Sequence, residues 1–112
     1  MTRRVTAHVV WLWAAFLGIH LVTAIAGWVY PSQPMGDVVL VYEPWATSAL
    51  SGGAIVGVSE TWVYPQLALL PMMLAKILSL PLVGVLGVSA AYLIAWVLLV
   101  SIVDVVVFGV LL

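Results

Sequence analysis

The chain has 112 residues, of which 66% are apolar and only 6% are charged. A soluble globular domain carries roughly 25% charged residues, so this composition excludes one. Intrinsic disorder is excluded as well, because it requires low hydrophobicity and high charge. The net charge of −1 offers no basic surface for nucleic acid, and the absence of cysteine excludes disulfides and thiolate metal sites. We therefore expect an integral membrane protein.

The first apolar run, at about residues 8–30, is long enough to cross a bilayer. Arg3 and Arg4 precede it, and basic residues beside a span favour the cytoplasmic side. The alternative is a cleaved signal peptide, because residues 24–26 read Ala-Ile-Ala. The apolar core of a signal peptide is only roughly 7–15 residues long, so we favour an uncleaved span with a cytoplasmic N-terminus.

Residues 31–61 form a less apolar segment with a distinct charge pattern. They carry Asp37, Glu43 and Glu60 but no Lys or Arg, which favours the external face. Glu43 and Glu60 are expected to be solvated loop charges. The three carboxylates could instead bind a divalent cation, although their spacing matches no metal-binding loop.

A short interfacial helix is expected within this loop. Pro44 suits a first helical position and Gly52-Gly53 a stop, which predicts a helix over Pro44–Leu50. Alternatively, the helix begins near Gly36 and kinks at Pro44. In both cases Trp45 favours a position on the membrane surface.

Two further spans are predicted at about residues 62–80 and 84–108. Pro71 is expected to kink the second span, and Lys76 to lie near the inner face, where its stem reaches the headgroups. A turn is expected at Ser79-Leu80-Pro81. The fold prediction is therefore a single all-α membrane domain over residues 1–112, with about three transmembrane helices and a structured external loop.

The third apolar run extends over residues 82–112 and is longer than a bilayer requires. A helix of this length would measure about 45 Å, against a hydrocarbon core of roughly 30 Å. We expect it to tilt, to protrude or to break near Asp104. Gly84 and Gly87 could allow close helix packing. Because the run ends without a polar tail, we expect the chain to be a fragment of a longer one.

Asp37 is the most plausible reactive group in the external loop. Partial burial against lipid and Trp45 would make its carboxylate a useful general base. The alternative is that Asp37 caps a helix by accepting backbone N–H bonds. His20 is interpreted as a mid-span packing contact and Asp104 as an interfacial structural residue. A proton or ion carrier that uses both remains a further alternative.

A series of short motifs follows a recognisable order between residues 36 and 73: Gly36-Asp37-Val38, Val41-Tyr42, Trp45-Ala46, Ser51-Gly52-Gly53 and Trp62-Val63-Tyr64-Pro65-Gln66-Leu67-Ala68-Leu69-Leu70-Pro71. This order resembles the first external loop of the GT-C glycosyltransferases, especially the actinobacterial polyprenol-phosphate-sugar-dependent mannosyltransferase-like group. Gln66 stands where that group has a second proline, at a structural position. The resemblance covers most of this chain but only the first part of a complete enzyme.

The resemblance implies an activity and a set of site residues. Asp37 matches the loop carboxylate that acts as general base, and Tyr42, Trp45 and Tyr64 would shape the sugar and lipid pocket, unless they only anchor the interface. The substrate would be a polyprenyl-phosphate sugar, with a mannose-like sugar expected. No metal ligand is assigned.

The implied location is the plasma membrane, as a multi-pass protein of the cell envelope. The loop has no cation for the donor phosphate, so the chain alone is expected to be inactive. It would need the remaining transmembrane helices of a larger chain, or a partner subunit. The alternative function is a small non-catalytic multi-span subunit or scaffold.

Overall fold

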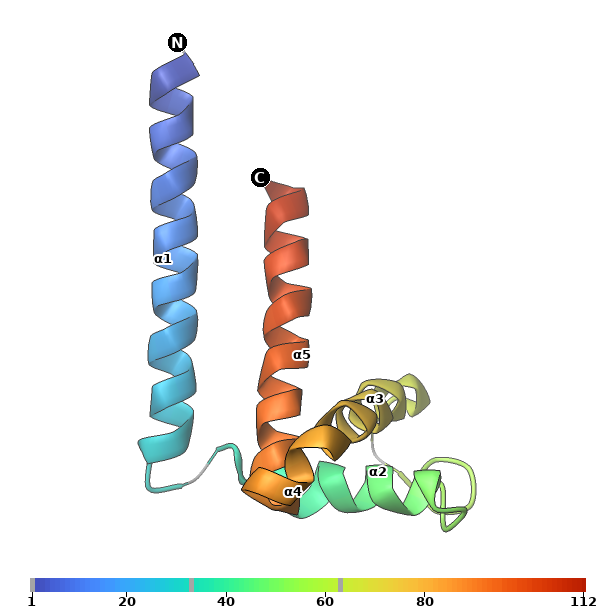
Figure 1. Cartoon of the computed structure of the whole chain (residues 1–112). Helices are drawn as coiled ribbons and strands as arrows, with labels where there is room; N and C mark the ends of the chain where they lie inside the picture. Colours follow the sequence, from blue (N-terminus) through green and yellow to red (C-terminus); the bar gives the residue numbers. More distant parts are fainter. Residues whose placement is uncertain (1, 33, 63) are drawn as a thin grey trace. The chain divides into compact units, whose positions relative to one another are not determined.

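The computed structural model describes residues 2–32, 34–62 and 64–112, and these residues are largely helical and form no β-strand (Figure 1). Gln33 of the predicted loop and Val63 of the motif series lie outside the described residues. The α-helices are α1 (Thr2–Val29), α2 (Glu43–Leu50), α3 (Leu69–Ser79), α4 (Val83–Leu86) and α5 (Val88–Leu111). Shorter helices of other types cover Val38–Tyr42, Gln66–Ala68 and Leu80–Leu82.

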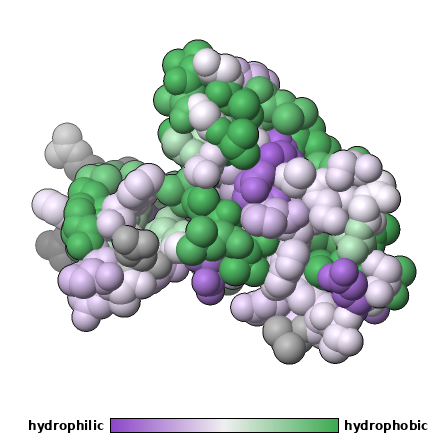
Figure 2. Space-filling view, turned by 90° about the horizontal axis from the view of Figure 1, so that it is seen from below, coloured by the Kyte–Doolittle hydropathy of each residue, from purple (hydrophilic) through white to green (hydrophobic). Residues whose placement is uncertain are grey.

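Within the described residues, three helical segments are long and apolar enough to cross a membrane: Thr6–Val29, Gln66–Leu86 and Val88–Leu111. The prediction of an all-α membrane protein is therefore confirmed. Large apolar side chains remain exposed along these segments, as expected for surfaces that face lipid or other helices. Figure 2, seen from below, shows apolar patches beside residues of intermediate hydropathy and a few hydrophilic residues.

The chain divides into two compact units, which are described separately. The first unit contains Met1–Met35 and Asp104–Leu112, and the second contains Gly36–Val103. In the first unit the rings of Phe16 and Phe108 stack with centroids 4.3 Å apart. Trp13 meets Phe108 edge-on at 4.8 Å. This aromatic contact joins α1 to the last part of α5.

The second unit begins with a helix that starts at Gly36, ahead of Pro44. The turn over Val38–Tyr42 is a π-helix, in which the N–H of Glu43 donates to the carbonyl of Val38. Pro44 lacks an N–H, and its ring would clash with the carbonyl four residues earlier in a regular α-helix. The wider π-turn accommodates it. The predicted helix start near Gly36 is confirmed, and the predicted kink at Pro44 stays a prediction.

The second span covers Gln66–Leu86, which differs from the predicted boundaries of about 62–80. Pro71 lies in the first turn of α3, where a missing N–H is tolerated. The turn predicted at Ser79-Leu80-Pro81 is wrong, because a 3₁₀ segment carries the helical path on to Leu86. The chain reverses instead at Gly87, whose φ of 78° is strained for any residue with a side chain.

The third span also differs from the prediction of about 84–108. It runs from Val88 to Leu111 as one α-helix and does not break at Asp104. No atom of the described residues lies within 4 Å of the positions of the missing side chains of Gly84 and Gly87, so these glycines do not mediate close helix packing within this chain. Among the described residues, the fully buried small ones are Ala46, Ala75, Ala91 and Ser79. Their small side chains allow close helix approach.

Candidate functional site

A cluster of aromatic rings occupies the second unit. Trp45 lies at its centre, with ring centroids 6.4 Å from Tyr42, 5.6 Å from Trp62 and 6.1 Å from Tyr64. Trp96 of α5 joins through Tyr42 at 5.2 Å. The structure thus brings together Tyr42, Trp45 and Tyr64, the three residues predicted to bind the substrate. We call these five rings the aromatic cluster, and their role in binding stays a prediction.

One polar group in the aromatic cluster is unsatisfied. The indole N–H of Trp62 is buried and has no hydrogen-bond partner among the described residues. A buried donor without an acceptor is unfavourable by roughly 1–3 kcal/mol. An acceptor oxygen supplied by a bound molecule would relieve this penalty. Trp62 was part of the motif series, but its side chain had no predicted role.

The loop after α2 folds back and positions Trp62 and Tyr64. The N–H of Gly57 donates to the carbonyl of Glu60 at 2.9 Å. The side-chain amide of Gln66 donates to the carbonyl of Gly57 at 2.8 Å. Gln66 therefore has a structural contact at the position where the resemblance has a second proline. A proline there could not make this bond.

Substituting Gly57 by alanine is expected to disturb the aromatic cluster. Gly57 has a φ of 81°, and an added Cβ would lie 3.0 Å from the Trp62 ring. The strain and the clash together should lower the free energy of unfolding by about 1–3 kcal/mol. Near-ultraviolet circular dichroism reports the packing of the aromatic rings and should lose intensity.

Gly52 supplies a matched control for this substitution. Its φ is 79°, but nothing lies within 4 Å of its missing Cβ. Gly52→Ala should therefore be strained without changing the aromatic signal. Equal loss of the signal in both variants would contradict the specific role of Gly57.

Asp37 lies at the start of the helix that leads to the aromatic cluster. Its backbone is α-helical and its side chain makes no capping bond, so the capping interpretation is wrong. The side chain is exposed within the protein, and no described residue forms a hydrogen bond or ion pair with it. Its expected partial burial against lipid stays a prediction. Burial, followed by the charges of Tyr64 and Asp37, raises the pKa of the Tyr42 hydroxyl. Asp37 is thus close enough to act electrostatically on the cluster.

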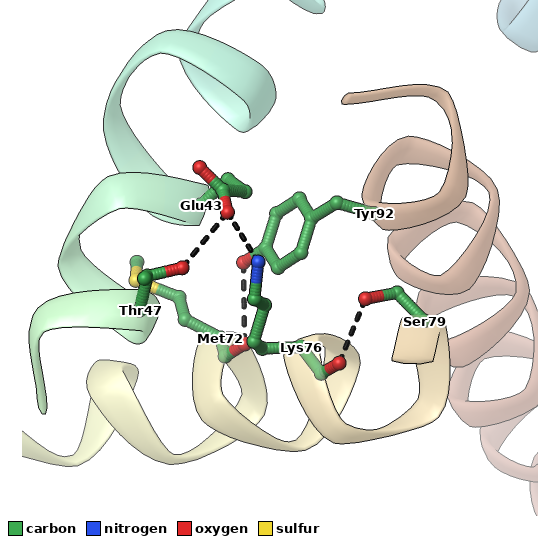
Figure 3. Close-up of polar contacts among 6 residues, drawn as sticks. All are labelled: Glu43, Thr47, Met72, Lys76, Ser79 and Tyr92. Atoms are coloured by element: carbon green, nitrogen blue, oxygen red, sulfur yellow. Dashed lines mark hydrogen bonds and ion pairs between the residues drawn. The ribbon is translucent and has the colours of Figure 1, made fainter. Parts of the chain in front are cut away.

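Glu43 and Lys76 form an ion pair between α2 and α3 (Figure 3). Their side chains are only 15% and 13% exposed. Thr47 also donates its hydroxyl to Glu43, at 2.8 Å. The prediction of Glu43 as a solvated charge is therefore wrong. The predicted separation of Lys76 from the loop is also wrong, because its ammonium group pairs with Glu43 of the loop helix. The side of the membrane on which Lys76 lies stays a prediction.

One further hydrogen bond joins α5 to α3, and another lies within α3 (Figure 3). The buried hydroxyl of Tyr92 on α5 donates to the carbonyl of Met72 at 3.2 Å. The hydroxyl of Ser79 donates to the carbonyl of Lys76 at 2.7 Å. Ser79 was predicted only as part of a turn. Tyr92 had no predicted role, because it lies in a run of apolar residues that resembles a lipid-facing helix.

The ion pair predicts a loss of stability at acidic pH. Burial opposes ionisation of Glu43, but the hydrogen bonds from Lys76 and Thr47 and the charge of Lys76 outweigh it, so the pKa of Glu43 is lowered from 4.5. A lowered pKa stabilises the folded state above the unfolded value, and this contribution is lost as the pH falls below 4.5. We expect the midpoint temperature of unfolding to be lower at about pH 3 than at pH 7. Glu43→Gln should remove this part of the difference, and an unchanged pH dependence in that variant would contradict the assignment.

The predicted divalent cation finds no support in the arrangement of the acidic residues. No group of three or more His, Asp or Glu side chains in the described part of the chain could hold a metal ion. Glu43 is already paired with Lys76. The structure therefore does not assemble Asp37, Glu43 and Glu60 as a common ligand set.

Comparisons with protein families, characterised proteins and solved structures found no match to this chain. The fold defines the class, an all-α membrane protein. The likeness to the GT-C glycosyltransferases rests on the motifs of residues 36–73 alone.

Proposed function

We propose that this chain is the N-terminal, sugar-binding part of a membrane glycosyltransferase that uses a polyprenyl-phosphate sugar. The proposal rests on the carboxylate of Asp37, which makes no capping bond. Asp37 lies at the start of the helix that leads to the aromatic cluster, which contains Tyr42, Trp45 and Tyr64. Sites for small molecules combine aromatic walls with a few polar groups that fix orientation. In this proposal the N-terminus is cytoplasmic and the Asp37 segment is external.

Asp37 is the general base in the proposed reaction. Its carboxylate accepts the proton of an acceptor hydroxyl while that oxygen forms a bond to the anomeric carbon. The bond from the anomeric carbon to the phosphate oxygen breaks, and the lipid phosphate leaves with the electron pair. The acceptor attacks the face opposite the leaving group, so the configuration at the anomeric carbon inverts. General-base catalysis of this kind contributes typically 10²–10⁴-fold.

The aromatic cluster holds the sugar in this proposal. Its rings present apolar faces, and the Tyr42 hydroxyl and Trp62 indole N–H can donate to sugar oxygens. The Tyr42 hydroxyl, whose pKa lies above the ordinary value of 10.0, is protonated at neutral pH and can donate. The donor phosphate needs a cation, and Lys76 is already engaged by Glu43. The cation must come from another part of the assembly.

The isolated chain is therefore expected to bind the donor without transferring its sugar. Binding of a radiolabelled polyprenyl-phosphate sugar to the chain in lipid nanodiscs measures the affinity. Tyr64→Ala should weaken it about tenfold, which corresponds to 1.4 kcal/mol. The control is Tyr30→Ala, because Tyr30 is an exposed tyrosine in the first unit.

An unlabelled polyprenyl phosphate without the sugar separates sugar recognition from lipid binding. The proposal predicts that it competes poorly with the glycosylated donor. Equal competition by both lipids would contradict sugar binding. Sugar transfer by the isolated chain would contradict the inference that it lacks a cation for the donor phosphate.

The alternative function is a non-catalytic membrane subunit or scaffold. It is favoured by the large apolar side chains exposed along α1 and α5, among them Trp11, Val22 and Val106. Such faces suit contacts with other membrane helices. Absence of donor binding, together with stable capture of a partner membrane protein, would favour this function.

A further inference from the structure

His20 and Asp104 meet in the first unit, within two helices that are apolar enough to span a membrane. The ring nitrogen Nε2 of His20 lies 2.9 Å from Oδ2 of Asp104. Their side chains are 36% and 44% exposed. Placing an ionisable residue within a membrane segment costs free energy, and such residues usually have a function. The expectation that Asp104 is an interfacial structural residue does not account for this contact.

The second ring nitrogen of His20 determines where the protons lie. Nδ1 lies 3.1 Å from the carbonyl oxygen of Phe16. A carbonyl can only accept a hydrogen bond, so Nδ1 must carry a proton. In a neutral histidine this leaves Nε2 with a lone pair directed at the Asp104 carboxyl group.

The 2.9 Å contact therefore requires one more proton. If Asp104 were ionised and His20 neutral, two lone pairs would face each other. A bond forms when the proton lies on Nε2, which gives an ion pair, or on Oδ2, which gives two neutral groups. Both forms hold the same number of protons, and the pair as a whole is neutral.

The surroundings favour this neutral, proton-loaded state. The Phe16 ring lies 4.2 Å from the His20 ring and stacks on Phe108. Trp13 contacts the rings of Phe16 and Phe108 edge-on. No other acidic or basic side chain in the described ranges bonds to His20 or Asp104. An unbalanced negative charge is unfavourable where aromatic rings and lipid replace water.

We propose that His20 and Asp104 form a binding site for one proton that links α1 to the last part of α5. The proton completes the hydrogen bond between His20 and Asp104 and so joins the two helices. Its release leaves a carboxylate facing a lone pair, which loosens the contact. The site is separate from the proposed transferase chemistry and uses neither Asp37 nor the aromatic cluster.

Nuclear magnetic resonance of the chain in lipid nanodiscs tests the proposal at neutral pH. Labelled ¹⁵N-histidine reports which ring nitrogens carry protons, and labelled ¹³C-aspartate reports whether Asp104 is ionised. The chain has two histidines, so the exposed His8 serves as an internal reference. The expected result is a proton on Nδ1 of His20 and a second proton on either Nε2 or the Asp104 carboxyl group.

Two results would overturn the proposal. One is a neutral His20 with its only proton on Nε2, and the other is a neutral His20 with its only proton on Nδ1 beside an ionised Asp104. Asp104→Asn is the matched variant, because its amide can donate to Nε2 and preserve the contact without an added proton. The second proton should be lost in this variant, while the Phe16 to Phe108 contact persists. A His20 ring that stays doubly protonated in the variant would also overturn the proposal.

Discussion

Replacing Asp37 by asparagine is expected to lower glycosyl transfer about 10²–10⁴-fold, the usual contribution of a general base. Asparagine keeps the shape of the side chain but cannot accept the proton of the acceptor hydroxyl. Transfer is measured in membranes of cells that produce the native protein, with a radiolabelled polyprenyl-phosphate sugar as donor. Donor binding should remain, because the aromatic cluster is unchanged.

The control for Asp37 is another exposed acidic residue of the same loop. Glu60 is exposed, and Glu60→Gln removes the same charge from the loop. We expect this variant to transfer sugar at the wild-type rate. Full activity of Asp37→Asn would contradict the role of Asp37 as base and would favour the subunit alternative.

Replacing Lys76 by methionine is expected to be the most destabilising change at the contact between α2 and α3. It leaves the Glu43 carboxylate largely buried without its cation. Removing one partner of a buried ion pair lowers stability by about 3–5 kcal/mol. Hydrogen exchange of the α2 amides in lipid nanodiscs should accelerate, because α2 loses its link to α3.

The double variant separates the charge from the packing. Glu43→Gln combined with Lys76→Met removes both charges, and replacing both partners is often nearly neutral. We expect it to regain most of the stability that Lys76→Met loses. If Lys76→Met were as stable as the wild type, the ion pair would not hold α2 against α3.

The membrane spans were predictable because the signal is local. Twenty consecutive apolar residues can only be buried in lipid or against other helices, and α1 and α5 follow from such runs. The turn between the second and third spans was misplaced. Ser79-Leu80-Pro81 has the local signature of a turn, whereas Gly87 reverses the chain through its positive φ.

The tertiary contacts were not predictable, because they join residues far apart in the sequence. In the sequence, Glu43 and Lys76 each look like a charged residue that water or lipid headgroups would solvate. No local sequence pattern indicates that they pair with each other. Trp96 and Tyr92 lie in an apolar run, so their contacts with the loop helices have no sequence signature.

The predicted site residues came from the order of the motifs. Tyr42, Trp45 and Tyr64 do gather in one cluster. The capping interpretation of Asp37 failed because the helix begins one residue earlier, at Gly36. Spacing alone cannot distinguish a capping position from a first helical turn.

The most direct test of the central claim is saturation-transfer nuclear magnetic resonance on the chain in lipid nanodiscs, with a polyprenyl-phosphate sugar added. Irradiation of the aromatic protons transfers magnetisation only to ligand protons that contact the rings. We predict strong transfer to the sugar-ring protons, and its loss in the Trp45→Ala variant. Transfer confined to the polyprenyl chain would show that the aromatic cluster contacts lipid and not sugar, which would contradict the account.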